Sequence, residues 1–95
     1  MADPYVSKPL SDRQLLRVAG KLDKDWESLA IHMGFTTAEV DEFKSNHPYN
    51  ARQQKFAMLT AWRDRMGSSA TREELLRVLE EAEVDDDATL ILCLY

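Results

Sequence analysis

The chain has 95 residues, the length of one small domain, and its 44% hydrophobic and 31% charged residues are typical of a folded protein. Its net charge of -5 disfavours a general attraction to nucleic acids or anionic membranes, so we expect protein partners. The single cysteine, Cys93, excludes an internal disulfide and predicts a reducing compartment, the cytoplasm by default. The longest apolar run, residues 90–94, is too short to cross a bilayer, and we expect no membrane insertion of this segment.

The amino-terminal part of the chain contains the only candidate linker. Pro4 and Pro9 disfavour a helix over residues 1–10, and no signal peptide is visible there. We therefore expect a flexible N-terminal segment, residues 1–10, followed by one folded domain, residues 11–95.

The first two helices are predicted from their caps and their apolar spacing. Ser11 and Gln14 form a capping-box pattern, which marks the start of a helix. The buried stripe that follows has helical spacing and consists of Leu15, Leu16, Val18, Ala19 and Leu22. A second helix covers residues 25–33 and ends before Gly34, a residue that suits the left-handed conformation of a helix stop. Its inner face consists of Trp26, Leu29, Ala30 and Met33.

The third and fourth helices follow from the same signals. Thr36 and Glu39 form a second capping-box pattern, and the third helix ends before Pro48. Its inner positions are Val40 and Phe43. Asn50 caps a fourth and longer helix over residues 51–66. The large anchors of this helix are Phe56, Leu59 and Trp62.

Two last helices complete the expected fold. Thr71 opens the fifth helix, whose inner residues are Leu75, Leu76, Val78 and Leu79. Asp86 or Asp87 caps the sixth helix, which ends in Leu90, Ile91, Leu92 and Leu94. No segment alternates with a period of two over the length of a strand. We therefore predict an all-α protein, a bundle of six short antiparallel helices.

In this order the motifs resemble those of the death domain, a six-helix interaction module of apoptotic and innate immune signalling, over residues 15–92. The resemblance is carried by Asp25-Trp26-x-x-Leu29-Ala30-x-x-x-Gly34, by Val40-Asp41-x-Phe43, and by Leu59-x-x-Trp62-x-x-x-x-Gly67-x-x-Ala70-Thr71-x-x-x-Leu75-Leu76-x-x-Leu79. The turn at residues 46–50 is similar to that of adaptors such as RAIDD and, less closely, to those of FADD and the ankyrins. Met33 replaces the usual leucine, a change that conserves volume.

The resemblance implies a death-fold Greek-key arrangement of the six helices. Caps and apolar spacing alone would equally suit a caspase-recruitment or death-effector domain, because they establish only a helical bundle. The pair of tryptophans, Trp26 and Trp62, favours the death domain.

The sequence contains few candidate catalytic or metal-binding residues. Cys93, His32 and His47 lie far apart on three predicted segments, whereas a nucleophile needs an adjacent base and a zinc site needs clustered ligands. The acidic run at residues 85–87 lacks the alternating ligands and the glycine of a calcium-binding loop, and it suits a helix start. No glycine-rich phosphate loop occurs. We therefore expect no enzyme, no metal and no cofactor.

Charged residues form three sets that are candidates for binding a partner. The basic set lies on helices one and four: Arg13, Arg17, Arg52, Lys55 and Arg63. The acidic set lies on helices two and three: Asp25, Glu27, Glu39, Asp41 and Glu42. The third set surrounds the end of helix four and the connection between helices five and six: Arg65, Arg72, Glu83, Asp85, Asp86 and Asp87. Opposite charges on different faces allow copies or relatives to associate head to tail.

The resemblance implies where such contacts form. Death domains contact one another through helices one and four against helix two, through the end of helix four against the fifth-to-sixth connection, and through helix three. The first two of these contacts coincide with the charge contrasts in this sequence.

The sequence therefore favours a non-enzymatic adaptor module that assembles an apoptotic or innate immune signalling complex. Its expected partners are other death-domain proteins, with self-association into a helical oligomer included. A second interpretation is a structural or autoinhibitory death domain of a larger scaffold or receptor. A third, a helical nucleic-acid reader, is opposed by the net acidity and by the lack of one basic recognition helix.

Overall fold

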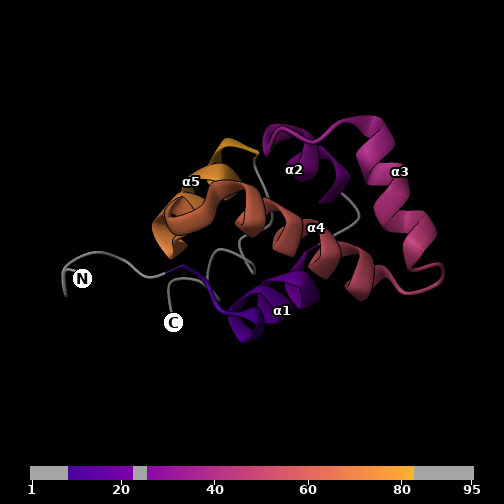
Figure 1. Cartoon of the computed structure of the whole chain (residues 1–95), viewed down its shortest axis with the longest axis horizontal. Coiled ribbons are helices and arrows are strands. Elements are labelled where there is room, and N and C mark those ends of the chain that lie inside the picture. The colour runs from indigo at the N-terminus through magenta and orange to yellow at the C-terminus, as the bar shows by residue number, and fades with distance from the viewer. Residues whose placement is uncertain (1–8, 23–25, 83–95) are drawn as a thin grey trace.

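The computed structural model of the chain describes residues 9–22 and 26–82, and this part is helical (Figure 1). Its elements are α1 (Asp12–Lys21), α2 (Trp26–His32), α3 (Thr37–Asn46), α4 (Ala51–Met66), the 3-10 turn η1 (Gly67–Ser69) and α5 (Arg72–Glu81). Within residues 9–22 and 26–82 the only β-type pairing is an isolated bridge between Pro9 and Thr71. The all-α prediction is confirmed for five helices, and the predicted sixth helix lies outside the described residues.

Both predicted capping boxes are formed. The Ser11 hydroxyl accepts from the Gln14 N–H at 3.2 Å, and the Gln14 side chain accepts from the Ser11 N–H at 2.9 Å. Thr36 and Glu39 make the same reciprocal pair at 3.2 and 3.0 Å. Each box satisfies two N–H groups that the first turn of a helix leaves without a partner. The starts of α1 and α3 are therefore set by residues three apart in sequence.

The other helix boundaries also follow local rules. Asn50 caps α4 and Thr71 caps α5, each by accepting from the N–H three residues further on. Gly34 and Gly67 follow α2 and α4 with φ of 97° and 59°, the left-handed region that a glycine enters without strain. The η1 turn, which begins at Gly67, was not predicted.

The core lies around α4, which packs against α1 on one side and α3 on the other, while α2 packs against α5 (Figure 1). Trp26 and Trp62 are both buried, as expected from their helical spacing with leucines. They share one cluster with most of the aliphatic residues that the sequence assigned to the inner faces of α1, α2 and α5. Burying one such large side chain stabilises the fold by about 1.5–3 kcal/mol.

Some core positions differ from the sequence expectation. Five residues expected inside are only half-buried: Leu16, Met33, Phe43, Phe56 and Leu76. Met58 is fully buried on α4, and Phe35, which follows Gly34 in a connection without helical periodicity, is 3% exposed. The Phe35 ring meets the Phe43 ring edge-on with centroids 5.4 Å apart, a favourable aromatic geometry.

The described chain begins with two residues that are attached to the domain. Leu10, which the sequence placed in the N-terminal segment, is buried in the core. Its N–H donates to the Ala70 carbonyl at 2.8 Å, next to the bridge between Pro9 and Thr71. The packed part of the described chain therefore includes Leu10. Among the described helices, none has the length and apolar character needed to span a membrane.

Candidate functional site

Lys55 and Arg63 of the basic set bind backbone carbonyls inside the molecule. The Arg63 guanidinium donates to the Leu10 carbonyl at 3.1 Å and pairs with the Asp12 carboxylate at 2.6 Å. The Lys55 ammonium donates to the Leu22 carbonyl at 2.6 Å. Leu22 is the C-cap of α1, so this contact supplies a donor and a positive charge where a helix exposes carbonyl groups. Lys55 and Arg63 thus hold α4 to the two ends of α1.

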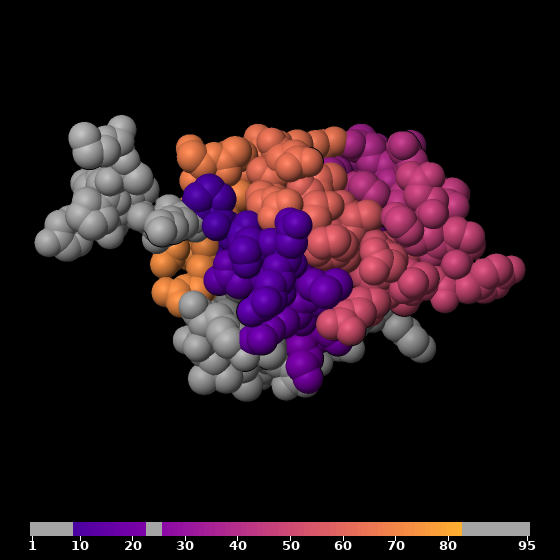
Figure 2. Space-filling model, turned by 60° about the horizontal axis from the view of Figure 1, so that its bottom comes forward, coloured from indigo at the N-terminus to yellow at the C-terminus, as the bar shows by residue number. Residues whose placement is uncertain are grey.

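The other basic residues lie along one side of the α1–α4 pair. Arg13 is exposed and Arg17 is half-buried, one helical turn apart on α1. Arg52 is exposed in the first turn of α4, and its guanidinium lies over Gly20, where an added Cβ would be 3.3 Å away. Positions 13, 17 and 20 share one face of a helix, so this contact places Arg52 beside the α1 arginines. Figure 2 shows α1 in front, with α4 next to it. Arg13, Arg17 and Arg52 are called the basic face below.

The acidic set is divided in the same way. Glu27 on α2 pairs with Lys44 on α3, and the hydrogen bond from Lys44 raises the pKa of that ammonium. Asp41 and Glu42 are exposed on α3 and are called the acidic face below. Asp25 lies outside the described residues.

Glu39 brings two of the predicted sets together. Its carboxylate closes the α3 capping box and also pairs with Arg65 at the end of α4, 26 residues away. The hydrogen bond from the Thr36 N–H, and then the Arg65 charge, hold the pKa of Glu39 below its ordinary value. The Arg65 guanidinium carbon also lies 4.2 Å from the centre of the Phe35 ring, a cation–π distance. Arg65 therefore joins α4 to α3 instead of extending freely toward α5.

The third set is described only in part. Arg72 is half-buried and pairs with the neighbouring Glu73 at 3.6 Å. The remaining members, Glu83, Asp85, Asp86 and Asp87, lie outside the described residues. The contrast of charges predicted around the fifth-to-sixth connection stays a prediction.

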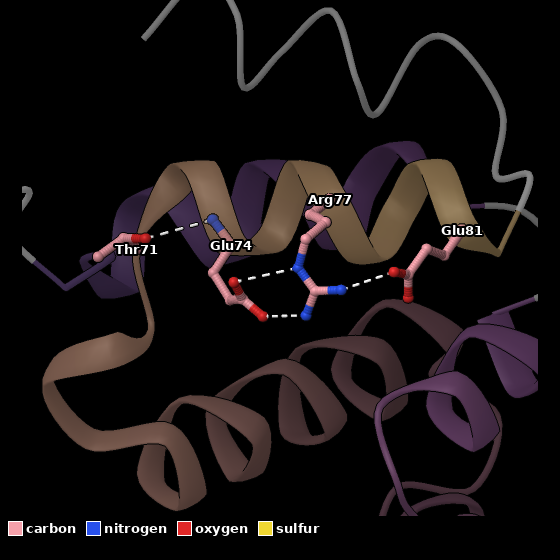
Figure 3. A network of polar contacts seen from close by, with 4 residues as sticks. All are labelled: Thr71, Glu74, Arg77 and Glu81. Carbon is pink, nitrogen blue, oxygen red and sulfur yellow. Dashed lines mark hydrogen bonds and ion pairs between the residues drawn. The ribbon is translucent and has the colours of Figure 1, made fainter.

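On α5 the structure contains a polar network that the sequence interpretation missed (Figure 3). Glu74, whose N–H is bonded to the Thr71 cap, accepts from Arg77, and Arg77 also reaches Glu81 at 2.6 Å. The hydrogen bond from Arg77 lowers the pKa of Glu74, and the same bond raises the pKa of Arg77. The network could have been predicted from the sequence, because opposite charges lie three and four residues apart on one helix.

Two apolar residues of the described chain are unusually exposed, and neither was singled out from the sequence. Tyr49, in the turn between α3 and α4, is 106% exposed, and Ile31 on α2 is 48% exposed. Ile31 lines a groove between α2 and α3 with a volume of about 200 Å³. No cluster of three or more metal-ligating side chains occurs within residues 9–22 and 26–82.

Comparison with known proteins identifies the fold. A family model for the death domain matches residues 12–92. The chain belongs to the death-domain family. The resemblance inferred from the tryptophan frames is thereby confirmed.

The relatives that match this death domain are longer chains. The death domain is 30% identical over 81 residues, 85% of its length, to ankyrin-3 of mouse and of human, of which it covers 4% and 2%. It is 27% identical over 84 residues, 88% of its length, to human THO complex subunit 1, of which it covers 13%. It thus spans only a small part of each of these relatives.

Membership of the family defines the general function of this death domain. Death domains are non-catalytic protein–protein interaction modules that bind other death domains. The structure adds that Lys55 and Arg63 serve the fold of this one, and that Arg13, Arg52, Asp41 and Glu42 are exposed.

Proposed function

We propose that this death domain assembles a signalling complex, of the apoptotic or innate immune kind, in which the basic face binds the acidic face of a partner death domain. The observation that carries the proposal is the exposure of Arg13 and Arg52 on α1 and α4, and of Asp41 and Glu42 on α3. The two faces are different surfaces of one molecule, so a contact between them is heterologous and can be repeated from copy to copy.

Exposed charges of this kind act mainly on partner choice and on the rate of encounter. Each exposed ion pair contributes only about 0.2–1 kcal/mol, so several are needed for a stable complex. Binding is therefore expected to weaken as salt rises, because exposed charges are screened over about 8 Å at physiological ionic strength. This salt dependence separates the proposed contact from one that rests on apolar burial.

Charge reversal on each face tests the proposal. Arg52→Glu and Asp41→Arg are made singly, and Glu80→Arg, an exposed reversal on α5, is the matched control. Circular dichroism and thermal unfolding verify the fold, and titration calorimetry at low and high salt measures binding to a panel of death domains that includes the matching part of ankyrin-3. Loss of binding by both reversals with retention by the control is the expected result. Wild-type binding by both reversals would contradict the proposal.

Contacts through the remaining predicted residues belong to the same proposal. Reversal of Asp86, which represents the fifth-to-sixth connection, and of Arg17 is expected to abolish co-assembly while the fold persists. We also propose that the protein acts in the cytoplasm and does not bind nucleic acid. A DNA-binding assay at low salt checks the last point, because electrostatic binding is strongest there.

A second candidate function is a structural or autoinhibitory module within a larger scaffold. The lengths of the relatives favour it, since the matched region is 2–4% of ankyrin-3. The natural full-length protein is compared with the isolated domain for binding to the same death-domain panel. Equal binding supports an adaptor, whereas binding by the isolated domain alone supports an autoinhibitory contact within the longer chain.

A further inference from the structure

The turn between α4 and α5 exposes a serine hydroxyl that the fold does not use. Ser68 is the middle residue of η1 and is exposed. Among the described residues its hydroxyl has no hydrogen-bond partner, whereas the hydroxyls of Ser11, Thr36 and Thr71 cap helices. No residue of η1 is buried, and a short 3-10 turn has weak hydrogen-bond geometry, so its local opening disturbs little of the core. The Ser68 hydroxyl is therefore accessible to a modifying enzyme.

The residues before Ser68 carry a distinctive charge pattern. Arg65 and Arg63 lie three and five residues before it. Ser45, which is also exposed, has Glu42 three residues before it and no arginine at either position. Protein kinases select substrates by such charge patterns, and carboxylates of an arginine-directed kinase bind the fork of a guanidinium group. The segment before Ser68 therefore fits a kinase of this class, and the segment before Ser45 does not.

Arg65 is the arginine that a kinase can reach. Its side chain is 47% exposed, and it is held by an exposed ion pair with Glu39. An exposed ion pair contributes little net free energy, so carboxylates of a kinase can replace Glu39 as the partner. The Arg63 side chain is only 24% exposed and donates to the Leu10 carbonyl. Recognition of the folded domain therefore depends mainly on Arg65.

Ser68 also lies between the two basic members of the third charged set. Arg65 precedes it by three residues and Arg72 follows it by four. The Arg72 guanidinium makes only a 3.6 Å pair with the neighbouring Glu73. A phosphate on Ser68 would add about −1.5 to −2 charges at neutral pH, compete for these arginines and repel the carboxylates of an approaching partner. Phosphorylation would therefore remove the positive half of the charge contrast at the end of α4.

We propose that Ser68 is the acceptor of an arginine-directed serine/threonine kinase, and that its phosphorylation weakens the binding of partner death domains at the α4–α5 turn. The Ser68 hydroxyl oxygen bonds to the γ-phosphorus of ATP, and the bond from that phosphorus to the oxygen of the ADP leaving group breaks. The hydroxyl proton passes to the catalytic base of the kinase. This inference rests on the proposed function, because it regulates the contact through the third charged set.

The modification is tested on the folded chain with ATP and purified protein kinase B, which is arginine-directed. Intact-mass and peptide mass spectrometry are expected to show one phosphoryl group, located on Ser68 and absent from Ser68→Ala. Ser45→Ala is the matched control and keeps the wild-type rate. Arg65→Gln, verified as folded by circular dichroism, is expected to react about tenfold more slowly, because it loses a charge-assisted contact with the kinase. An unmodified wild type, or a wild-type rate for Arg65→Gln, would overturn the assignment.

The effect on binding is measured by titration calorimetry with the same panel of death domains. Phosphorylated protein is expected to bind about tenfold more weakly than unmodified protein at low salt, with a smaller difference at high salt, because the added charge is screened. Ser68→Glu, which adds a single charge, is expected to show a smaller loss. Ser68→Gln has the same size without the charge and is expected to keep wild-type affinity. Equal affinities of the phosphorylated and unmodified proteins would overturn the regulatory effect.

The failure of this inference is distinguishable from the failure of the proposed function. Unchanged binding after phosphorylation, together with lost binding by Arg52→Glu and Asp41→Arg, overturns the regulation and retains the contact between the basic and acidic faces. Weakened binding after phosphorylation, with wild-type binding by both reversals, supports the regulation and overturns that contact. The phosphorylation assay needs no partner, so it tests Ser68 as the acceptor even if no death domain in the panel binds.

Discussion

The Arg63 guanidinium donates to the carbonyl of Leu10, 53 residues earlier in the chain, at 3.1 Å. This bond fastens the chain before α1 to the middle helix of the domain, and the ion pair between Arg63 and Asp12 lies beside it. Leu10 is buried in the core, so water cannot easily replace Arg63 as the hydrogen-bond donor to its carbonyl. A residue that looked available for partners thus has a structural role.

Replacement of Arg63 by leucine is therefore expected to destabilise the fold by about 1–2 kcal/mol, because it leaves the Leu10 carbonyl without its donor. Urea unfolding measures the loss, and hydrogen exchange of the Leu10 N–H is expected to accelerate. Asp12→Asn is the control, since it removes only an ion pair with an exposed carboxylate and is expected to cost under about 1 kcal/mol. Equal stability of Arg63→Leu and wild type would contradict a structural role.

Lys55 and Arg13 are expected to respond differently to the same change. Lys55→Met removes the donor to the Leu22 carbonyl and should cost about 1 kcal/mol, whereas Arg13→Met on the exposed side of α1 should stay within about 0.5 kcal/mol of wild type. Thermal unfolding of the two variants side by side gives the comparison. In the binding assay the order reverses, and Arg13→Met is expected to weaken binding to a partner.

Acid should weaken the link between α3 and α4. The pKa of Glu39 is lowered in the folded state by the Thr36 N–H and by Arg65, so the ionised carboxylate stabilises the fold above its unfolded pKa. That contribution is lost as pH falls through the folded pKa, below the ordinary value near 4.3. The free energy of unfolding is therefore expected to decrease from about pH 5 downward.

Glu39→Gln isolates this effect, because glutamine can still close a capping box but cannot pair with Arg65 as an anion. Its free energy of unfolding should be lower than wild type at neutral pH and should fall less steeply in acid. Chemical unfolding at a series of pH values measures both slopes. If the free energies of unfolding of wild type and Glu39→Gln changed in parallel with pH, the pKa of Glu39 would not differ between the folded and unfolded states.

Two glycines should respond in opposite directions to alanine. Gly34→Ala forces a non-glycine residue to a φ of 97° and is expected to cost about 1 kcal/mol or more, although nothing within 4 Å would touch the new Cβ. Gly20→Ala lies within α1 and is expected to stabilise by up to about 1 kcal/mol, since the nearest group is the flexible end of Arg52. The melting temperatures of the two variants, each compared with wild type, test this expectation. A melting temperature of Gly34→Ala above that of wild type would contradict the conformational explanation.

The sequence by itself determined the family, the helical class and most helix starts and ends. These depend on local interactions, such as the capping boxes of Ser11 with Gln14 and of Thr36 with Glu39, which join residues three apart. A pattern of short range is readable in the sequence because the chain alone fixes the distance between the groups. The network of Glu74, Arg77 and Glu81 was readable in the same way and was missed.

Only the tertiary structure decided which charges are engaged and which are exposed. Lys55 reaches a carbonyl 33 residues away and Arg65 a carboxylate 26 residues away, and no local spacing predicts either contact. The exposure of Tyr49 and the groove beside Ile31 likewise depend on how α2, α3 and α4 pack. The packing of helices places side chains from distant segments within bonding distance, so the division between charged residues that hold the fold together and charged residues that stay exposed is a property of the fold.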